Sequence, residues 1–286
     1  MSSRWFLVQI LSITAAIIIS IFAVGQLLTG PASTAVGILS TDFPTEPVQF
    51  PANSESPVHG WLVYGVPGHG VVLLAHSIRS NRLEMLSRAR FLNEQGYSVL
   101  LIDLQAHGES PGKRITFGAR ESESIEAAVA FLRENFPFER IGAIGVSLGA
   151  AAIVLAKRTL KLDAVVLESL HPTIEEAIEN RLKLHFGEYG SVLLPLILFQ
   201  FSFYMDIPTD ELSPIAKIDN LNTPLLLISG TNDAHTTLPE TERLFAAARE
   251  PKEIWIIPGA GHFNMHSYAG RTYENRISAF LHENLR

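Results

Sequence analysis

The hydrophobic pattern begins with a long apolar segment near the N-terminus. Residues 5–28 contain no charged side chain and consist mostly of Ile, Leu, Val, Ala and Phe. About 20 apolar residues in a helix cross the core of a bilayer, so residues 1–28 are predicted to be a membrane anchor. A cleavable signal peptide is the alternative, with Ala23-Val24-Gly25 as a weak cleavage site, although its apolar core usually has about 7–15 residues. A buried soluble helix fits least, because the segment has no polar face.

Positive charge around this segment predicts its orientation. Arg4 precedes it, and no Lys or Arg follows before Arg79. By the positive-inside rule the N-terminus stays in the cytoplasm and the rest of the chain lies outside, as a single-pass membrane protein. Cleavage of a signal peptide would instead give a secreted protein.

After the apolar segment, short apolar runs alternate with helical periodicity. Residues 29–45 are rich in Gly, Pro, Ser and Thr and are predicted to be a linker into a domain over residues 46–286. Strands are expected at residues 60–65, 71–75, 98–103, 141–146, 164–168, 225–229 and 253–257, and helices at 83–94, 121–134, 148–157, 239–249 and 271–283. Alternating strands and helices, with strands that are continuous Val/Ile/Leu runs, predict an α/β fold whose mostly parallel sheet is covered on both faces.

Residues 172–212 interrupt this alternation and are predicted to be an inserted cap. Its apolar run, residues 192–203, contains Pro195 and Gln200 and is too short for a second membrane span. A cap helix packed on the core is the expected structure. A surface that faces an acyl chain or a membrane is the alternative.

Composition excludes several classes of function. Of the 286 residues 47% are hydrophobic, which is enough for a sizeable core, and the net charge of -7 argues against nucleic-acid binding. The absence of cysteine excludes disulfides, thiolate catalysis and Cys-zinc sites. No His, Asp or Glu cluster has metal-ligand spacing on one element, so we expect no metal site.

One serine lies in a sequence typical of a nucleophile. Gly145-Val-Ser147-Leu-Gly149 joins the expected strand 141–146 to the expected helix that follows it. In a nucleophile elbow the serine occupies a strained strand-to-helix turn that exposes its hydroxyl at the carboxyl edge of the sheet. A serine in a buried glycine-rich bend is the competing interpretation.

A nucleophilic serine requires a base, and the base requires an acid that orients it. Asp233 follows strand 225–229 and His262 follows strand 253–257, so both lie on loops at the same sheet edge as Ser147, in the order Ser, Asp, His. Glu168, which also ends a strand, is an alternative acid. His235 and His266 are close enough in sequence to be neighbours of the triad.

The oxyanion of a tetrahedral intermediate needs backbone donors. We expect the N–H of Leu148, after the serine, and the N–H of Ile78, in the loop after strand 71–75. Arg79 and Arg82 in that loop could bind a substrate carboxylate, although solvated charges are the simpler expectation.

An ordered set of motifs from about residue 58 to the C-terminus resembles the α/β-hydrolase superfamily, and most closely its serine aminopeptidase-like and monoacylglycerol lipase-like branch. The motifs are His76-Ser77, residues 96–110 with Asp103, His107 and Ser110, Gly145-x-Ser147-x-Gly149, residues 224–233 and Gly261-His262. The resemblance implies an eight-stranded sheet, a Ser-Asp-His triad, no cofactor, and a turn shaped by Asp103, His107 and Ser110. The family usually has His-Gly where this chain has His76-Ser77, and a side chain at residue 77 could narrow the site or shift the loop that carries Ile78.

These features together predict a membrane-anchored serine hydrolase that cleaves carboxylic esters through an acyl-enzyme. Its expected partners are the membrane and a small-molecule ester or an acylglycerol-like lipid. One alternative is a peptidase that binds a free α-amino group with cap acids such as Glu175, Glu176 or Glu179. The other is a catalytically inactive, membrane-tethered binding protein that keeps the fold.

Overall fold

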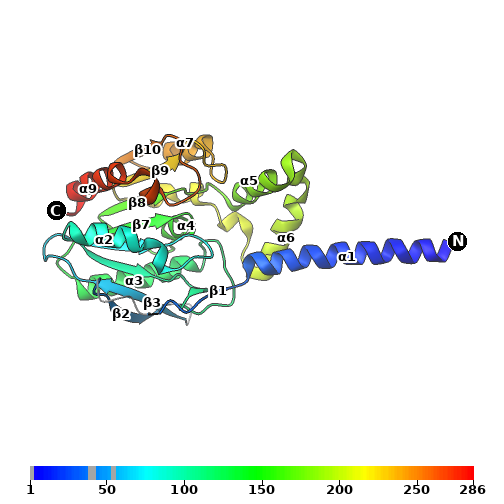
Figure 1. Ribbon diagram of the computed structural model, residues 1–286, viewed down its shortest axis with the longest axis horizontal. Helices are drawn as coiled ribbons and strands as arrows, with labels where there is room; N and C mark the ends of the chain where they lie inside the picture. The colour runs from blue at the N-terminus through cyan, green and yellow to red at the C-terminus, as the bar shows by residue number, and fades with distance from the viewer. Residues whose placement is uncertain (1–2, 38–42, 53–55) are drawn as a thin grey trace.

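A twisted eight-stranded sheet forms the centre of the computed structural model, which describes residues 3–37, 43–52 and 56–286 (Figure 1). The strand order is β10-β9-β8-β7-β4-β5-β3-β2. The strands are β2 (Glu46–Pro51), β3 (Pro57–Val63), β4 (Val71–Ala75), β5 (Ser98–Ile102), β7 (Ile141–Val146), β8 (Ala164–Glu168), β9 (Leu225–Gly230) and β10 (Lys252–Ile257). From β10 to β5 all pairs are parallel, whereas β3 is antiparallel to both β5 and β2. The predicted α/β fold with a mostly parallel sheet of eight strands is confirmed.

Helices cover both faces of the sheet and create two cores. Alternate residues of β4 belong to different cores: Leu73 packs with α3 and α4, and Leu74 packs with α2 and α9. This two-sided burial explains why the strand is apolar at every position. The helices of these layers are η1 (Arg82–Met85), α2 (Leu86–Glu94), α3 (Glu121–Asn135), α4 (Leu148–Val154), η4 (Pro214–Ala216), η5 (Ile218–Asn220), α7 (Leu238–Ala247), α8 (Met265–Ala269) and α9 (Arg271–Leu285).

Between β8 and β9 the chain forms a helical cap with its own small core. The cap contains α5 (Ile174–Phe186), η2 (Gly187–Leu193), α6 (Leu194–Met205) and η3 (Thr209–Glu211). Pro195 lies in the first turn of α6, where its missing N–H has no intrahelical partner to lose. Ile178, Leu182 and Phe201 are buried together with Leu155 from the main domain, so the cap is packed onto that domain.

The N-terminal segment is a continuous helix, α1 (Ser3–Thr29), that projects away from the body of the molecule (Figure 1). Among the described residues, length and apolar composition select Ile174–Met205 as a possible span, and in α1 only the shorter stretch Trp5–Ala16. Ile174–Met205 is the bent α5–η2–α6 unit of the cap. The N-terminal membrane span therefore remains a prediction.

Residues 1–2 of the predicted anchor and residues 38–42 of the predicted linker lie outside the described residues. In the described part of the linker, β1 (Ala32–Ser33) pairs with β6 (His107–Gly108) as a separate parallel pair.

The structure differs from the sequence-based expectation in a helix boundary and in an edge strand that was not predicted. The helix expected at residues 148–157 ends at Val154. The edge strand β2 was not predicted as a strand because Pro47 and Pro51 interrupt its pattern and Phe50 is its one fully buried side chain. Proline is tolerated there because an edge strand leaves part of its backbone unpaired.

Candidate active site

Ser147 lies at the tight turn between β7 and α4. Its backbone has φ 49° and ψ −102°, a conformation that L-residues rarely adopt. A Cβ at Gly145 would come within 2.6 Å of the Ala150 nitrogen, and one at Gly149 within 2.4 Å of the Ala75 oxygen. The turn therefore closes only with glycine at both flanking positions, which is the geometric reason for the Gly-x-Ser-x-Gly pattern.

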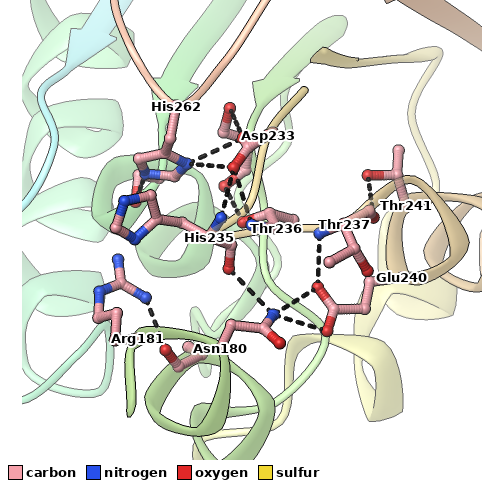
Figure 2. Close-up of polar contacts among 12 residues, drawn as sticks. Asn180, Arg181, Asp233, His235, Thr236, Thr237, Glu240, Thr241 and His262 are labelled. Atoms are coloured by element: carbon pink, nitrogen blue, oxygen red, sulfur yellow. Dashed lines mark hydrogen bonds and ion pairs between the residues drawn. The ribbon is translucent and has the colours of Figure 1, made fainter. Parts of the chain in front are cut away.

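The structure brings Ser147, His262 and Asp233 together from three separate loops. The His262 Nε2 atom lies 3.3 Å from the Ser147 Oγ. On the other side of the imidazole, Nδ1 lies 2.9 Å from Oδ2 of Asp233 and 3.2 Å from Oδ1 (Figure 2). The Asp233 side chain is fully buried, whereas that of His262 is 18% exposed. A proton can therefore pass from the serine to an imidazole that the carboxylate orients.

Besides its contacts with the His262 ring, Asp233 makes four hydrogen bonds that hold it in place. Its Oδ1 accepts from the backbone N–H groups of His235 and Thr236 at 2.9 and 2.8 Å (Figure 2), and its Oδ2 accepts from the Ser169 hydroxyl at 3.0 Å. Burial by itself raises the pKa of Asp233. The hydrogen bond and charge of His262, together with the hydrogen bonds from Thr236 and Ser169, outweigh the effect of burial and lower the pKa. Asp233 is therefore ionised at neutral pH.

The fourth of these bonds runs from the backbone N–H of Asp233 to the Gly230 carbonyl, over 3.3 Å, and fixes the loop to the end of β9. Sequence reasoning did not find Ser169, which supports the carboxylate from the end of β8. The one sequence feature that could have indicated Ser169 is its position directly after β8, a strand that ends at the active-site edge.

Glu168, the alternative acid, has a different set of partners. Its carboxylate pairs with Arg88 at 2.6 Å and accepts a hydrogen bond from the Tyr273 hydroxyl at 2.6 Å, and all three side chains are buried. The hydrogen bonds of His262 go to Asp233 and Ser147 instead. Glu168 therefore belongs to a buried ion pair between β8 and the helices on one face.

The two expected oxyanion donors line the same cavity as Ser147. Leu148 and Ile78 both border it, and among the described residues neither backbone N–H donates to a protein acceptor. The N–H of Gly149 bonds the His76 carbonyl at 3.1 Å, so the elbow and the loop that carries Ile78 are joined directly. Both amides therefore lack a protein acceptor at the cavity that contains Ser147.

Ser77, where the related family usually has glycine, does not narrow the cavity. Its hydroxyl donates to Glu84 at 2.7 Å and its N–H donates to the same carboxylate oxygen at 3.0 Å. Beside it, the buried His76 accepts from the Leu104 N–H and bonds the Ser77 carbonyl. Burial, with His107 and Arg82 nearby, lowers the pKa of His76 to about 3. The ring is therefore neutral and structural.

Of the two loop arginines, Arg79 is exposed and borders the cavity, whereas Arg82 is not the solvated charge expected from the sequence. Arg82 is buried and pairs with Asp103 at 2.5 Å and with Glu109. Arg79 donates to the Leu27 carbonyl at 2.8 Å and to the Gly30 carbonyl at 3.3 Å. The C-terminal end of a helix carries unpaired carbonyls and partial negative charge. Arg79 therefore stabilises the C-terminal end of α1.

The turn that follows β5 is built by the residues that the resemblance assigned to it. Asp103 accepts from the N–H groups of Arg82 and Glu109, and the Ser110 hydroxyl donates to the Asp103 carbonyl at 2.7 Å. His107 is buried against His76. These contacts hold the loops at the active-site edge in place.

A cavity of about 420 Å³ opens beside Ser147 under the cap. Its walls are mostly apolar side chains of α5 and α6, such as Ile178, Leu182 and Phe201. Volumes in this range hold small organic ligands. The cavity therefore offers an apolar site next to the proposed nucleophile.

Positive charge and two neutral histidines lie at the same site. Arg181 of α5 lines the cavity, points toward the triad loops (Figure 2), and bonds the Ala177 carbonyl at 2.7 Å. Burial lowers its pKa, against the opposing charge of Asp233. Burial, with Arg181 and His262 nearby, lowers the pKa of His171 to about 3, and the same causes lower the pKa of His235.

The two histidines expected near the triad differ in their surroundings. The ring of His235 lies 5.0 Å from that of His262, centroid to centroid. His266 instead bonds Ser87 at 3.1 Å and Glu274 at 3.0 Å, away from the triad. Among residues 3–37, 43–52 and 56–286, no group of three or more His, Asp or Glu side chains could hold a metal ion.

A sheet of this order with a serine elbow, an acid and a histidine at one edge defines an α/β-hydrolase architecture. The sequence profile of the alpha/beta hydrolase family matches residues 58–274. The chain belongs to this family.

Relatives with similar sequences occur in bacteria. The uncharacterized protein Rv2307c of Mycobacterium tuberculosis (strain H37Rv) is 30% identical over 227 residues, which are 78% of this chain and 74% of that protein. The uncharacterized protein YqkD of Bacillus subtilis is 26% identical over 214 residues, 73% of this chain and 70% of that one.

Solved structures share the fold. The Pyrococcus furiosus esterase Pf2001 superposes with a TM-score of 0.74 at 22% identity, over 91% of this chain and 99% of that one. The hypothetical protein PA2218 of Pseudomonas aeruginosa superposes with a TM-score of 0.63 at 19% identity, over 88% of this chain and 97% of that one. At these identities the similarity establishes the fold.

Proposed function

We propose that the protein is a serine hydrolase that cleaves carboxylic esters, with Ser147 as nucleophile, His262 as base and Asp233 as orienting acid. The observation that carries the proposal is the continuous chain of contacts from the Ser147 Oγ through the imidazole to the buried carboxylate, at 3.3 and 2.9 Å. Serine hydroxyls react with acyl groups when a histidine removes their proton and a carboxylate fixes the histidine.

In the proposed mechanism the Ser147 Oγ attacks the ester carbonyl while His262 takes its proton. The N–H groups of Leu148 and Ile78 donate to the oxyanion of the tetrahedral intermediate. The protonated His262 then gives its proton to the leaving alkoxide, which departs as the alcohol and leaves an acyl-enzyme. Water, deprotonated by His262, attacks the acyl-enzyme, and the protonated His262 returns this proton to the Ser147 Oγ as the carboxylic acid leaves.

The lining of the cavity supports an ester with an apolar acyl group. The residues that border Ser147 are mainly aliphatic and aromatic side chains of the cap, and such walls favour hydrocarbon over a polar peptide. A medium or long acyl chain, as in acylglycerol-like lipids, is therefore the proposed substrate. The structural similarity to an esterase is consistent with this choice.

The peptidase alternative has less support, because the cap acids are engaged elsewhere. Glu176 pairs with Arg243, and Glu179 pairs with Lys183 at 2.9 Å. The charged group of α5 that lines the cavity is the cation Arg181, which would repel a free α-amino group. Glu175 is not among the residues that line the cavity.

We further propose that α1 anchors the protein in a membrane, with its N-terminus in the cytoplasm and the hydrolase domain outside. The support is the charge-free segment 5–28, the single Arg4 before it, and a continuous helix over Ser3–Thr29. Secretion after cleavage of this segment is the alternative, and thiol labelling of introduced cysteines distinguishes the two.

The function is tested with the full-length protein in detergent, offered 4-nitrophenyl esters and aminoacyl 4-nitroanilides. We expect ester hydrolysis, and we expect Ser147→Ala to lower kcat by about 10⁴-fold or more, because triad serines contribute effects of this size. Ser267→Ala, at an exposed serine, is the matched control and should retain full activity. Faster cleavage of the anilides would favour a peptidase. A folded wild type with no activity on either substrate would favour a binding protein.

A further inference from the structure

The C-terminal part of α1 is fixed to the hydrolase domain by specific contacts. The Tyr204 hydroxyl of α6 donates to the Phe22 carbonyl at 3.1 Å. Gly25 lies so close to α6 that a Cβ there would come within 2.2 Å of the Gln200 Oε1. With Arg79 bonded to the last carbonyls of the helix, the end of α1 has a defined position against the cap and the proposed oxyanion loop.

Two side chains of α1 form part of the cavity that contains Ser147. Val24 and Leu28 border it together with Ile78 and Leu148. The two residues are four apart, so they lie on the same face of the helix. Leu27 points elsewhere and is 68% exposed, compared with 38% for Leu28. The helix that is proposed to anchor the protein is therefore also a wall of the proposed substrate site.

Large apolar side chains are exposed on the cap beside this wall. The cap surface consists of Phe186, Tyr189, Val192, Phe199 and Phe203, which are each 60% exposed or more. It lies on the α5–η2–α6 unit, at the end of the molecule from which α1 projects (Figure 1). Exposed apolar surface of this extent is typical of contact with a membrane or a partner.

The length of α1 agrees with this arrangement. Its 27 residues make a helix of about 40 Å, and a bilayer core is about 30 Å thick. A helix that spans the core thus has about 10 Å left for its contact with the domain. The cap surface then faces the bilayer directly, and the cavity lies beside the point where α1 leaves it.

We propose that the cavity is an acyl-chain site completed by Val24 and Leu28, and that its substrate is a long-chain ester drawn from the membrane that α1 spans. The acyl chain passes between α1 and the cap to reach Ser147. This inference rests on the proposed ester hydrolysis, and it adds the source of the substrate and a specificity-determining role for α1.

The test measures kcat/KM of the full-length protein in detergent micelles with 4-nitrophenyl butyrate and 4-nitrophenyl laurate. Leu28→Trp fills the cavity wall, and Leu27→Trp places the same side chain on the neighbouring exposed position. We expect Leu28→Trp to lower the laurate-to-butyrate ratio by about 10-fold or more, the discrimination that small changes of size give in apolar pockets. Leu27→Trp should keep the wild-type ratio.

A second variant controls for the possibility that Leu28→Trp disturbs folding. Val24→Trp, one turn earlier on the same face, should lower the ratio as Leu28→Trp does, because laurate hydrolysis falls more than butyrate hydrolysis, with the thermal unfolding midpoint unchanged. An unchanged ratio in both variants, with esters still hydrolysed, would overturn the role of α1 and leave the proposed function standing. A wild type that hydrolyses neither ester would overturn the proposed function itself.

Discussion

At the residue scale, the strained backbone of Ser147 is maintained by its neighbours. A residue in such a sparsely populated conformation costs about 1–3 kcal/mol. The Ser147 N–H bonds the Glu168 carbonyl at 2.8 Å, and the Ser147 carbonyl accepts from the Ala151 N–H at 2.9 Å. These bonds to β8 and α4 keep the side chain in the wall of the cavity, where His262 reaches it.

The buried histidines predict how stability depends on pH. The pKa of His171 is about 3 in the folded protein and about 6.5 in an unfolded chain. Between these values the unfolded chain binds a proton that the folded protein does not, so stability decreases as the pH falls from 6.5 toward 3. His171 faces Arg181 and His262, which add to this effect. Each such histidine contributes a slope of at most about 1.4 kcal/mol per pH unit.

His171→Gln, which cannot take up a proton, should therefore make the free energy of unfolding less dependent on pH. Urea unfolding of the wild type and the variant at pH 7 and pH 5 measures the two slopes. His76 remains in both proteins and contributes equally to each. Equal slopes would show that His171 is not held neutral by the fold.

At the scale of elements, the sequence predicted what depends on local pattern. The continuous apolar runs of β4 and β7 identified the parallel sheet, and the order of Ser147, Asp233 and His262 at strand ends identified three side chains that the fold brings together. The pairing of Arg88 with Glu168 joins residues 80 positions apart, and no local pattern reveals such a contact. The contact of α1 with α6 was missed for the same reason.

The ion pair between α2 and β8 should contribute to stability and not to the chemical step. Glu168→Gln leaves the Arg88 guanidinium buried without its carboxylate, which typically costs about 3–5 kcal/mol. The free energy of unfolding in urea should fall accordingly, while kcat/KM for esters stays close to that of the wild type. A variant with normal stability and a large loss of kcat would instead make Glu168 the acid of the triad.

At the scale of the whole molecule, the active site lies where three parts of the chain meet. The sheet edge supplies Ser147 and its partners, the cap supplies the apolar walls, and α1 adds Val24 and Leu28. In Figure 1 the cap and α1 lie at one end of the molecule and the C-terminus at the other. If α1 spans a membrane, this geometry places the opening of the cavity against the bilayer.

The proposed topology is measurable because the sequence contains no cysteine. Phe138 is 99% exposed on the hydrolase domain, so Phe138→Cys provides a single reactive thiol. A membrane-impermeant maleimide should label Phe138→Cys in intact cells and should label Ser2→Cys only after lysis. Labelling of Ser2→Cys alone in intact cells would reverse the orientation, and recovery of Phe138→Cys in the medium would indicate secretion.

The most direct test of the central claim is the reaction of the full-length protein with a fluorophosphonate, followed by mass spectrometry of the modified peptide. We predict a single covalent adduct on Ser147, no adduct in Ser147→Ala, and a greatly slowed reaction in His262→Ala, because the imidazole must remove the serine proton. A correctly folded wild type that forms no adduct, or forms it on another residue, would contradict the assignment of Ser147 as the nucleophile.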